Sequence, residues 1–349
     1  PTRSPRSRCT GYGDSESAIL GFYQGTGNVV RGLGLLAVPL TGANQDISLY
    51  GVSFAKGANG HVNGCWIGVD LDGKTKPFIA PADGVTGFRY RGKNDQNQVT
   101  NVILVSGVTV GVAKGSKNPR SEFNVIAGVP GIPVILEGEN ERMSGNFFGV
   151  LPDGKTDYNV ATIEELKGNF EGYIEVGRAG NNTIIGVDGD GVNDADERNV
   201  FGGMLPESLG GYNHTIEFYG QTPGTNIVIA GNLFGVGVDG TRFANAVSPL
   251  NAPGGSAVYQ FGSDLDGKSD DLEGNRVYGN WPAATLAQVV DAGAIQPFFS
   301  ELNQTAIVSL RGNVLVNNNT PPVDPLKSDG AFLTNYYARF LKAPDAGVV

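Results

Sequence analysis

The sequence predicts an all-β fold in which short parallel strands are wound into a β-solenoid. Glycine is abundant, with 53 residues in a chain of 349, which favours tight turns between short strands. Charged residues make up only 17% of the chain, too few for many solvent-exposed helices. A short phrase also returns at a spacing of roughly 41 residues, and a fixed period of that length is typical of repeat architectures.

The repeated phrase consists of Gly, then Asn or Cys, two apolar residues, Gly and Val, followed closely by an Asp-Gly pair. Its clearest copies span 64–75, 145–156 and 231–241. Weaker copies begin at Gly107, Asn182, Gly274 and Gly312. The apolar pair supplies bulky side chains to a narrow core, and the flanking glycines allow sharp corners. Each Asp-Gly pair is expected to form a turn in which Gly has a positive φ.

A second strand-like run lies inside most of these periods, at 101–105, 133–137, 172–176, 215–219 and 257–261. Each period therefore predicts two layers of about 20 residues. Stacked about 4.8 Å apart, some fourteen layers would form a rod of roughly 65 Å. The main alternative is a β-propeller, whose blades also repeat at about 40 residues. A blade needs four strands, however, and the period offers two.

An asparagine that recurs at one place in successive layers can bond to the backbone above and below it. The candidates for such a ladder are Asn146, Asn232, Asn275 and Asn313. Cys65 occupies the same place in its copy, which predicts that it points into the interior. Cys9 and Cys65 are the two cysteines of the chain and lack metal-type spacing. We expect a disulfide in an oxidising compartment, with two buried thiols as the alternative.

Three phrases, 182–186, 198–203 and 231–235, resemble the repeats of secreted bacterial right-handed parallel β-helix proteins, the pectin-lyase-like fold group. The resemblance covers residues 17–318. It implies a right-handed parallel β-helix located outside the cell or at its surface. It does not select an activity, because the group includes polysaccharide lyases, hydrolases, adhesins and fibre proteins.

The two ends of the chain differ from the repeats. Residues 1–16 are basic and are expected to form a tail or an arm that docks on a neighbour. Residues 319–349 predict a linker and a short C-terminal helix, because apolar residues recur there at i and i+4: Phe332, Leu333, Tyr336, Tyr337, Phe340 and Leu341. The helix would cap the open end of the solenoid or dock on the next subunit.

The charge excludes some partners. A formal net charge of −10 argues against nucleic acid, which requires a basic face. No apolar run approaches the roughly 20 residues of a membrane span.

Residues 188–197 carry the sharpest local motif, with five carboxylates separated by small residues. Calcium prefers six to eight oxygen ligands in a flexible loop. The segment also resembles the calcium-binding acidic repeats of thrombospondin type 3 modules. The sequence therefore predicts a structural calcium site, with a solvated acidic loop as the alternative. Its candidate ligands are Asp188, Asp190, Asn193, Asp194, Asp196 and Glu197.

Two further features bear on catalysis. An acidic run at Asp264, Asp266, Asp270, Asp271 and Glu273 could supply the carboxylate pair of a glycosidase, although such runs are more often polar turns. Polysaccharide lyases of the resembling group use a Lys or Arg base beside acidic calcium ligands, which singles out Arg198. The alternative for Arg198 is an ion pair with Asp196 or Glu197. The sequence has only two histidines and suggests no triad or zinc site, so no catalytic residue is assigned.

These observations favour a structural, fibre-forming or adhesive surface protein over an enzyme. Self-association end to end would be a heterologous contact that builds filaments. A separate surface partner and a carbohydrate are the other expected ligands. The alternative function is a secreted polysaccharide lyase or glycoside hydrolase with a groove along the β-helix.

Overall fold

The structure, a computed structural model, describes residues 7–11, 17–22, 25–37, 49–54, 57–73, 88–90, 105–127, 133–136, 138–158, 174–176, 180–202, 214–218, 225–243, 248–251, 258–279, 299–300 and 307–317. The predicted linker and C-terminal helix at 319–349 lie outside these residues. Of the predicted N-terminal arm, residues 7–11 are described, and they form strand β1 (Ser7–Gly11) at one end of a sheet.

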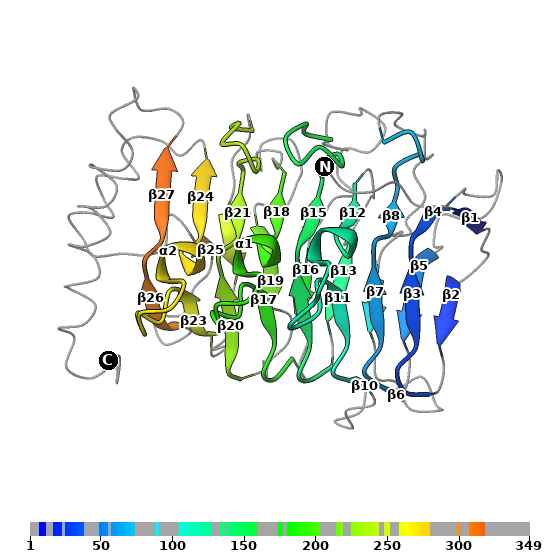
Figure 1. Cartoon of the computed structure of the whole chain (residues 1–349), viewed down its shortest axis with the longest axis horizontal. Coiled ribbons are helices and arrows are strands. Elements are labelled where there is room, and N and C mark those ends of the chain that lie inside the picture. The colour runs from blue at the N-terminus through cyan, green and yellow to red at the C-terminus, as the bar shows by residue number, and fades with distance from the viewer. Residues whose placement is uncertain are drawn as a thin grey trace.

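The described regular structure is almost entirely β, in three large parallel sheets (Figure 1). Sheet A has nine strands: β1, β4 (Leu33–Ala37), β8 (Trp66–Ile67), β12 (Asn124–Ile126), β15 (Asn146–Phe148), β18 (Val200–Phe201), β21 (Leu233–Phe234), β24 (Arg276–Gly279) and β27 (Val314–Asn317). Sheet B has eight: β2 (Ser17–Phe22), β5 (Leu49–Phe54), β9 (Phe88–Tyr90), β13 (Val134–Leu136), β16 (Ile174–Val176), β19 (His214–Phe218), β22 (Ser248–Asn251) and β25 (Phe299–Ser300).

Sheet D also has eight strands: β3 (Val29–Arg31), β7 (His61–Asn63), β11 (Thr109–Gly111), β14 (Arg142–Ser144), β17 (Ile184–Gly186), β20 (Ile227–Ala230), β23 (Val258–Gly262) and β26 (Ile307–Arg311). A small sheet C pairs β6 (Gly57–Ala58) with β10 (Val105–Ser106). The described helices are one 3₁₀ turn, η1 (Pro119–Ser121), and two short helices, α1 (Asp194–Glu197) and α2 (Asp270–Glu273). No described helix is long and apolar enough to cross a membrane.

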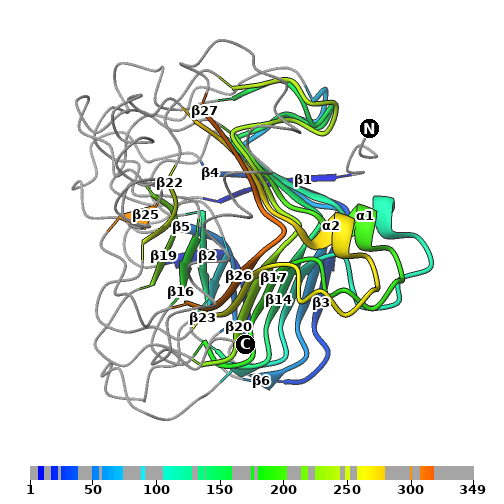
Figure 2. The same cartoon turned by 90° about the vertical axis from the view of Figure 1, so that its left-hand side faces the viewer.

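The chain visits the three large sheets in a fixed order. After β1 it passes through sheets B, D and A eight times, and we call each passage a coil. Every pairing between named strands is parallel. Figure 2, a view along the stack, shows the strands of successive coils superposed. A propeller is excluded for the described residues, because its blades are antiparallel.

The predicted number of layers is wrong. One period of roughly 40 residues makes a single coil of three strands, not two layers of two strands. Nine strands in sheet A give a stack of about 38 Å instead of 65 Å. The error arose because two weak copies of the repeated phrase, at Gly107 and Asn182, precede strands of sheet D, whereas the clear copies precede strands of sheet A.

The interior is a stack of apolar columns. In sheet A the inward column contains three phenylalanines, and the rings of Phe148, Phe201 and Phe234 stack with centroids 5.0 and 4.9 Å apart. Sheet D contributes a second column: Val30, Val62, Val110, Met143, Ile185, Ile229 and Phe261. Each of these side chains is at most 3% exposed, so the coils share one continuous core.

The predicted asparagine ladder is confirmed and is longer than expected. It contains Asn124, Asn146, Asn199, Asn232, Asn275 and Asn313, all buried. Each carboxamide except that of Asn313, the last, donates to the next rung, as in Asn146 Nδ2 to Asn199 Oδ1 at 2.9 Å. Each also donates to a carbonyl of sheet D in the preceding coil, as in Asn199 Nδ2 to Met143 O at 2.9 Å. The ladder therefore ties sheet A to sheet D.

Cys65 is the first member of this column, as predicted. It is buried, and its N–H donates to Asn124 Oδ1 at 2.9 Å. The register places Cys9 two strands and two residues away, because Cys9 pairs with Leu35 and Leu35 pairs with Ile67. Ideal strand geometry then separates the two Cα atoms by about 11 Å, beyond the roughly 7 Å that a disulfide spans. The predicted disulfide therefore requires strand β1 to shift, and it stays a prediction.

The outer face of sheet A is also apolar. Trp66, Val125, Phe147, Val200 and Leu233 form one buried cluster there with residues from two hairpins, 149–158 and 235–243. The hairpins fold back over the sheet through the Asp-Gly turns, where Gly154 and Gly240 have φ of 72° and 85° as predicted. Sheet A is therefore covered on both faces over these coils.

Candidate metal centre

Three long loops join sheet D to sheet A in alternate coils. They are 112–123, 187–198 and 263–274, each twelve residues long, and they carry η1, α1 and α2. The other described connections from sheet D to sheet A are short turns. Figure 2 shows the long loops projecting from the same side of the stack, with α1 beside α2. The acidic motif predicted to bind calcium is the second long loop.

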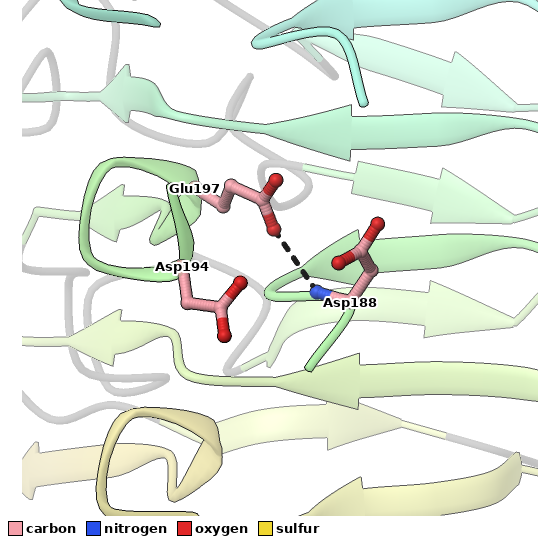
Figure 3. Close-up of side chains that lie close together, drawn as sticks. All are labelled: Asp188, Asp194 and Glu197. Carbon is pink, nitrogen blue, oxygen red and sulfur yellow. Dashed lines mark hydrogen bonds between the residues drawn. The ribbon is translucent and has the colours of Figure 1, made fainter. Parts of the chain in front are cut away.

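All three loops close in the same way. In the second loop, the Asp188 N–H donates to Glu197 Oε2 at 3.1 Å (Figure 3). The equivalent bonds are Ala113 N to Glu122 Oε2 at 2.9 Å and Asp264 N to Glu273 Oε2 at 3.1 Å. A glutamate eleven residues after the end of the sheet D strand therefore fixes the start of each loop.

The structure brings three of the six predicted ligands together. One carboxylate oxygen from each of Asp188, Asp194 and Glu197 lies within 4.8 Å of the others. Asp194 and Glu197 are on helix α1 and are buried, and their carboxylates point toward the start of the loop at Asp188 (Figure 3). This group is a candidate metal centre because carboxylate oxygens are the ligands that calcium prefers.

The other three predicted ligands face elsewhere. Asp190 Oδ1 accepts the Val192 N–H at 2.8 Å, and its second oxygen lies 3.1 Å from Lys114 Nζ. Asn193 Nδ2 donates to Ser116 O in the first long loop at 2.7 Å. Asp196 Oδ1 accepts from Arg120 Nε at 3.0 Å. Asn193 and Asp196 thus hold the second loop against the first.

Besides Arg120, two cations from earlier coils neutralise part of the acidic loop. Lys114 Nζ lies 3.2 Å from Asp188 Oδ2. Buried Arg142 contacts both Asp188, at 2.8 Å, and Glu197, at 2.5 Å. Sequence reasoning missed these partners because each is distant along the chain, and only the stacking of coils brings it to the loop.

Burial dominates the electrostatics of Glu197. Removal from water raises the pKa of Glu197 to about 7, although Arg142 opposes this by favouring the carboxylate. Asp190 differs: burial opposes its ionisation, but the Val192 N–H and Lys114 outweigh that effect and lower its pKa. The loop therefore combines a buried carboxyl that resists ionisation, Glu197, with a partly buried carboxylate that is stabilised, Asp190.

The third long loop is a second copy of this arrangement. Asp264, Asp270 and Glu273 also bring carboxylate oxygens within 4.8 Å of one another. Glu273 is buried, and burial raises its pKa. Asp270 bonds the Gly267 N–H and the Ser263 hydroxyl, at 3.1 and 2.8 Å. These bonds are those of a polar turn, the alternative given for this acidic run.

Arg198 does not form the expected ion pair with Asp196 or Glu197, which pair instead with Arg120 and Arg142. Its Nε donates to Gly231 O at 2.6 Å. Burial lowers the pKa of Arg198 to about 10, and Arg276 adds to this effect. Arg198 also lines a cavity of about 270 Å³ on the outer face of sheet A.

No family model, curated protein or solved structure matches this chain. Function must therefore be argued from the fold and the site alone.

The cavity that Arg198 lines is a second candidate site on this side of the molecule, besides the carboxylate cluster. Its apolar lining includes Phe123, Phe147, Val200, Leu233 and Val238, and its polar lining consists of Arg120, Asp153, Asp196 and Arg198. It lies between the long loops and the hairpins, which Figure 2 shows on the same side of sheet A.

Proposed function

We propose that the chain is a right-handed parallel β-helix that acts as a structural, fibre-forming or adhesive protein outside the cell or at its surface. The fixed passage through sheets B, D and A supports the helical path. The right hand is the one that connections between parallel strands adopt in almost all proteins. The extracellular location rests on the resemblance to secreted proteins.

The observation that carries the proposal is the continuity of the stack. The asparagine ladder runs without a break from Asn124 to Asn313, and the apolar columns run beside it. Cross-links of this kind between successive coils, from the second to the last described, favour a rigid rod. Rigidity is what a spacer, fibre or display surface requires.

The ends of the stack support self-association. At one end sheets A, D and B finish on β27, β26 and β25, and at the other on β1, β3 and β2. An edge strand presents N–H and C=O groups that can pair with another strand. Because the two ends are different surfaces, pairing between them would be heterologous and would generate filaments.

Electron microscopy and sedimentation of the full chain over a range of concentrations test this role. The expected result is rods that join end to end as the concentration rises. Leu315→Lys should disperse them, because Leu315 is in register with buried Val277 at the last coil of sheet A. Val314→Lys is the matched control, since Val314 is in register with exposed Arg276. Discrete monomers at every concentration would refute end-to-end assembly.

The cavity on sheet A favours the second candidate, a polysaccharide lyase or glycoside hydrolase. Apolar surface with carboxylates and arginines at its margin suits a sugar ring. Two of its carboxylates, Asp153 and Asp196, could serve acid–base chemistry. Incubation with a polysaccharide panel, followed by detection of unsaturated products or new reducing ends, separates this candidate from the structural role.

A further inference from the structure

We propose that the loop 187–198 binds one calcium ion through the carboxylates of Asp188, Asp194 and Glu197. The site goes beyond the structural role and does not depend on it. Its function would be to fix helix α1 between the first and third long loops.

A buried oxygen without a partner points to the ion. Asp194 is only 3% exposed. Its Oδ2 accepts the Gly191 N–H at 3.1 Å, but its Oδ1 is buried and has no hydrogen-bond partner among the described residues. At the same place in the third loop, Asp270 Oδ1 bonds the hydroxyl of Ser263. Val187 replaces that serine in the second loop and cannot donate, so Asp194 needs another electropositive partner.

The charges around the loop leave room for one divalent cation. Five carboxylates lie between Asp188 and Glu197, and three cationic side chains, Lys114, Arg120 and Arg142, pair with four of them. Asp194 is the fifth and has no ion pair with a described residue. The five carboxylates and the three cations paired with them give a formal balance of −2, which a calcium ion would neutralise. Arg198, the last residue of the loop, is left out of this balance because its Nε bonds Gly231 O instead.

The spacing of the three oxygens fits calcium. Calcium–oxygen distances are 2.3–2.6 Å, so two ligands on opposite sides of the ion are about 5 Å apart. Oxygens that lie within 4.8 Å of one another can therefore all reach one calcium ion.

The first long loop shows that the acidic residues are not needed to build the loop. It has the same length and the same closing bond from Glu122 to the Ala113 N–H. Yet Ala113 and Pro119 stand at the places of Asp188 and Asp194. The carboxylates of the second loop are therefore an addition to a loop that folds without them, which is expected when they hold a ligand.

Calcium binding to the full chain, stripped with a chelator and measured by calorimetric titration, tests the site. Asp194→Asn keeps an acceptor for the Gly191 N–H and removes the charge. We expect this variant to bind one calcium ion fewer per chain than the parent, whatever the third loop contributes. Glu122→Gln is the control, because it alters the equivalent closing bond where no cation is proposed, and it should bind as many ions as the parent.

Thermal unfolding distinguishes a lost ligand from a damaged fold. Without calcium, Asp194→Asn should melt within about 2 °C of the parent or above it, because a buried charge without a partner is removed. With millimolar calcium, only the parent and Glu122→Gln should gain thermal stability. Equal numbers of ions bound by the parent and Asp194→Asn, or none bound by the parent at several millimolar calcium, would overturn the proposal.

Discussion

The chain enters sheet D and leaves it through single residues in the left-handed conformation, yet the two corners use different residues. Between sheets B and D the residue is usually an exposed asparagine; the described members are Gly27, Asn59, Gly107, Asn140, Asn182 and Asn226. Between sheets D and A the short turns use glycine throughout: Gly32, Gly64, Gly145, Gly231 and Gly312. The backbone requirement is the same at both corners.

Crowding explains the difference. A Cβ on Gly145 would lie 2.4 Å from Val112 Cγ2 and 2.7 Å from Asp196 O, because the long loops of neighbouring coils pack over this corner. The other corner faces water, so asparagine, which tolerates positive φ, is accepted there. Its side chains even form a second ladder, as in Asn182 Nδ2 to Asn140 Oδ1 at 3.0 Å. Where a long loop packs over the corner, crowding and not backbone geometry thus selects glycine; Gly32, where a Cβ would meet nothing within 4 Å, is the exception.

Gly145→Ala should have the largest effect. We expect a loss of about 4 kcal/mol in the free energy of unfolding, from the left-handed strain of a non-glycine residue and from overpacking against Val112. Gly32→Ala is the matched control: Gly32 also has a positive φ, of 67°, but a Cβ there would meet nothing within 4 Å. Urea unfolding should give about 1 kcal/mol for the control. Equal losses would show that crowding is not the cause.

Asn199→Ala should cost about 3 kcal/mol. The substitution removes the acceptor of Asn146 Nδ2 and the donor to Met143 O, and buried groups left unsatisfied cost about 1–3 kcal/mol each. Asn182→Ala removes exposed bonds and adds left-handed strain, so it should cost only about 1 kcal/mol. Urea midpoints of the two variants measure the contrast. Similar losses would mean that the buried ladder has no special weight.

The sequence predicted the asparagines of one corner better than those of the other. The buried ladder was predicted where Asn follows Gly, at Asn146, Asn232, Asn275 and Asn313. Asn124 and Asn199 were missed because they follow the long loops, where Phe123 and Arg198 stand in place of glycine. The exposed column was not recognised: two of its members, Gly107 and Asn182, begin weak copies of the repeated phrase and were interpreted as equivalent to the clear copies, which belong to the other corner.

Fold class was easier to predict than layer count or site. Parallel strands and Asp-Gly turns follow from local patterns. Strands of two or three residues, such as Thr109–Gly111 in sheet D, are too short to show alternation, so the third strand of each coil was not seen. The loop carboxylates were visible as a motif, but Lys114 and Arg142 were not, because contacts between coils leave no trace in local sequence.

The stability of the protein should depend on pH through Glu197, the buried carboxyl in the second long loop between sheets D and A. The pKa of Glu197 in the folded protein, about 7, lies above the value of 4.5 for the free side chain. The folded state therefore holds the proton more tightly, and its stability should fall as the pH rises from about 4.5 to 7, then level off. The expected loss is on the order of 3 kcal/mol, since the pKa rises from 4.5 to about 7 and each pKa unit corresponds to about 1.4 kcal/mol.

Glu197→Gln should remove this part of the pH slope. The amide still accepts the Asp188 N–H, and it cannot ionise beside Arg142 and Asp188. Urea unfolding between pH 4.5 and 7.5, in a chelator, measures the slope of the variant and the parent. A Glu197→Gln protein with the parental slope would show that the carboxyl of Glu197 ionises as it does in water.

Asn182→Gly should have the smallest effect, within about 0.5 kcal/mol of the parent. Glycine reaches positive φ without strain, which offsets the loss of the exposed bonds to Asn140 and Asn226. The chain already contains this replacement at Gly107, where φ is 68° at the same place in another coil. A loss above about 1.5 kcal/mol would mean that the exposed side chains bind the coils together, as those of the buried ladder do. A neutral result would leave left-handed geometry as the reason that asparagine is found at this corner.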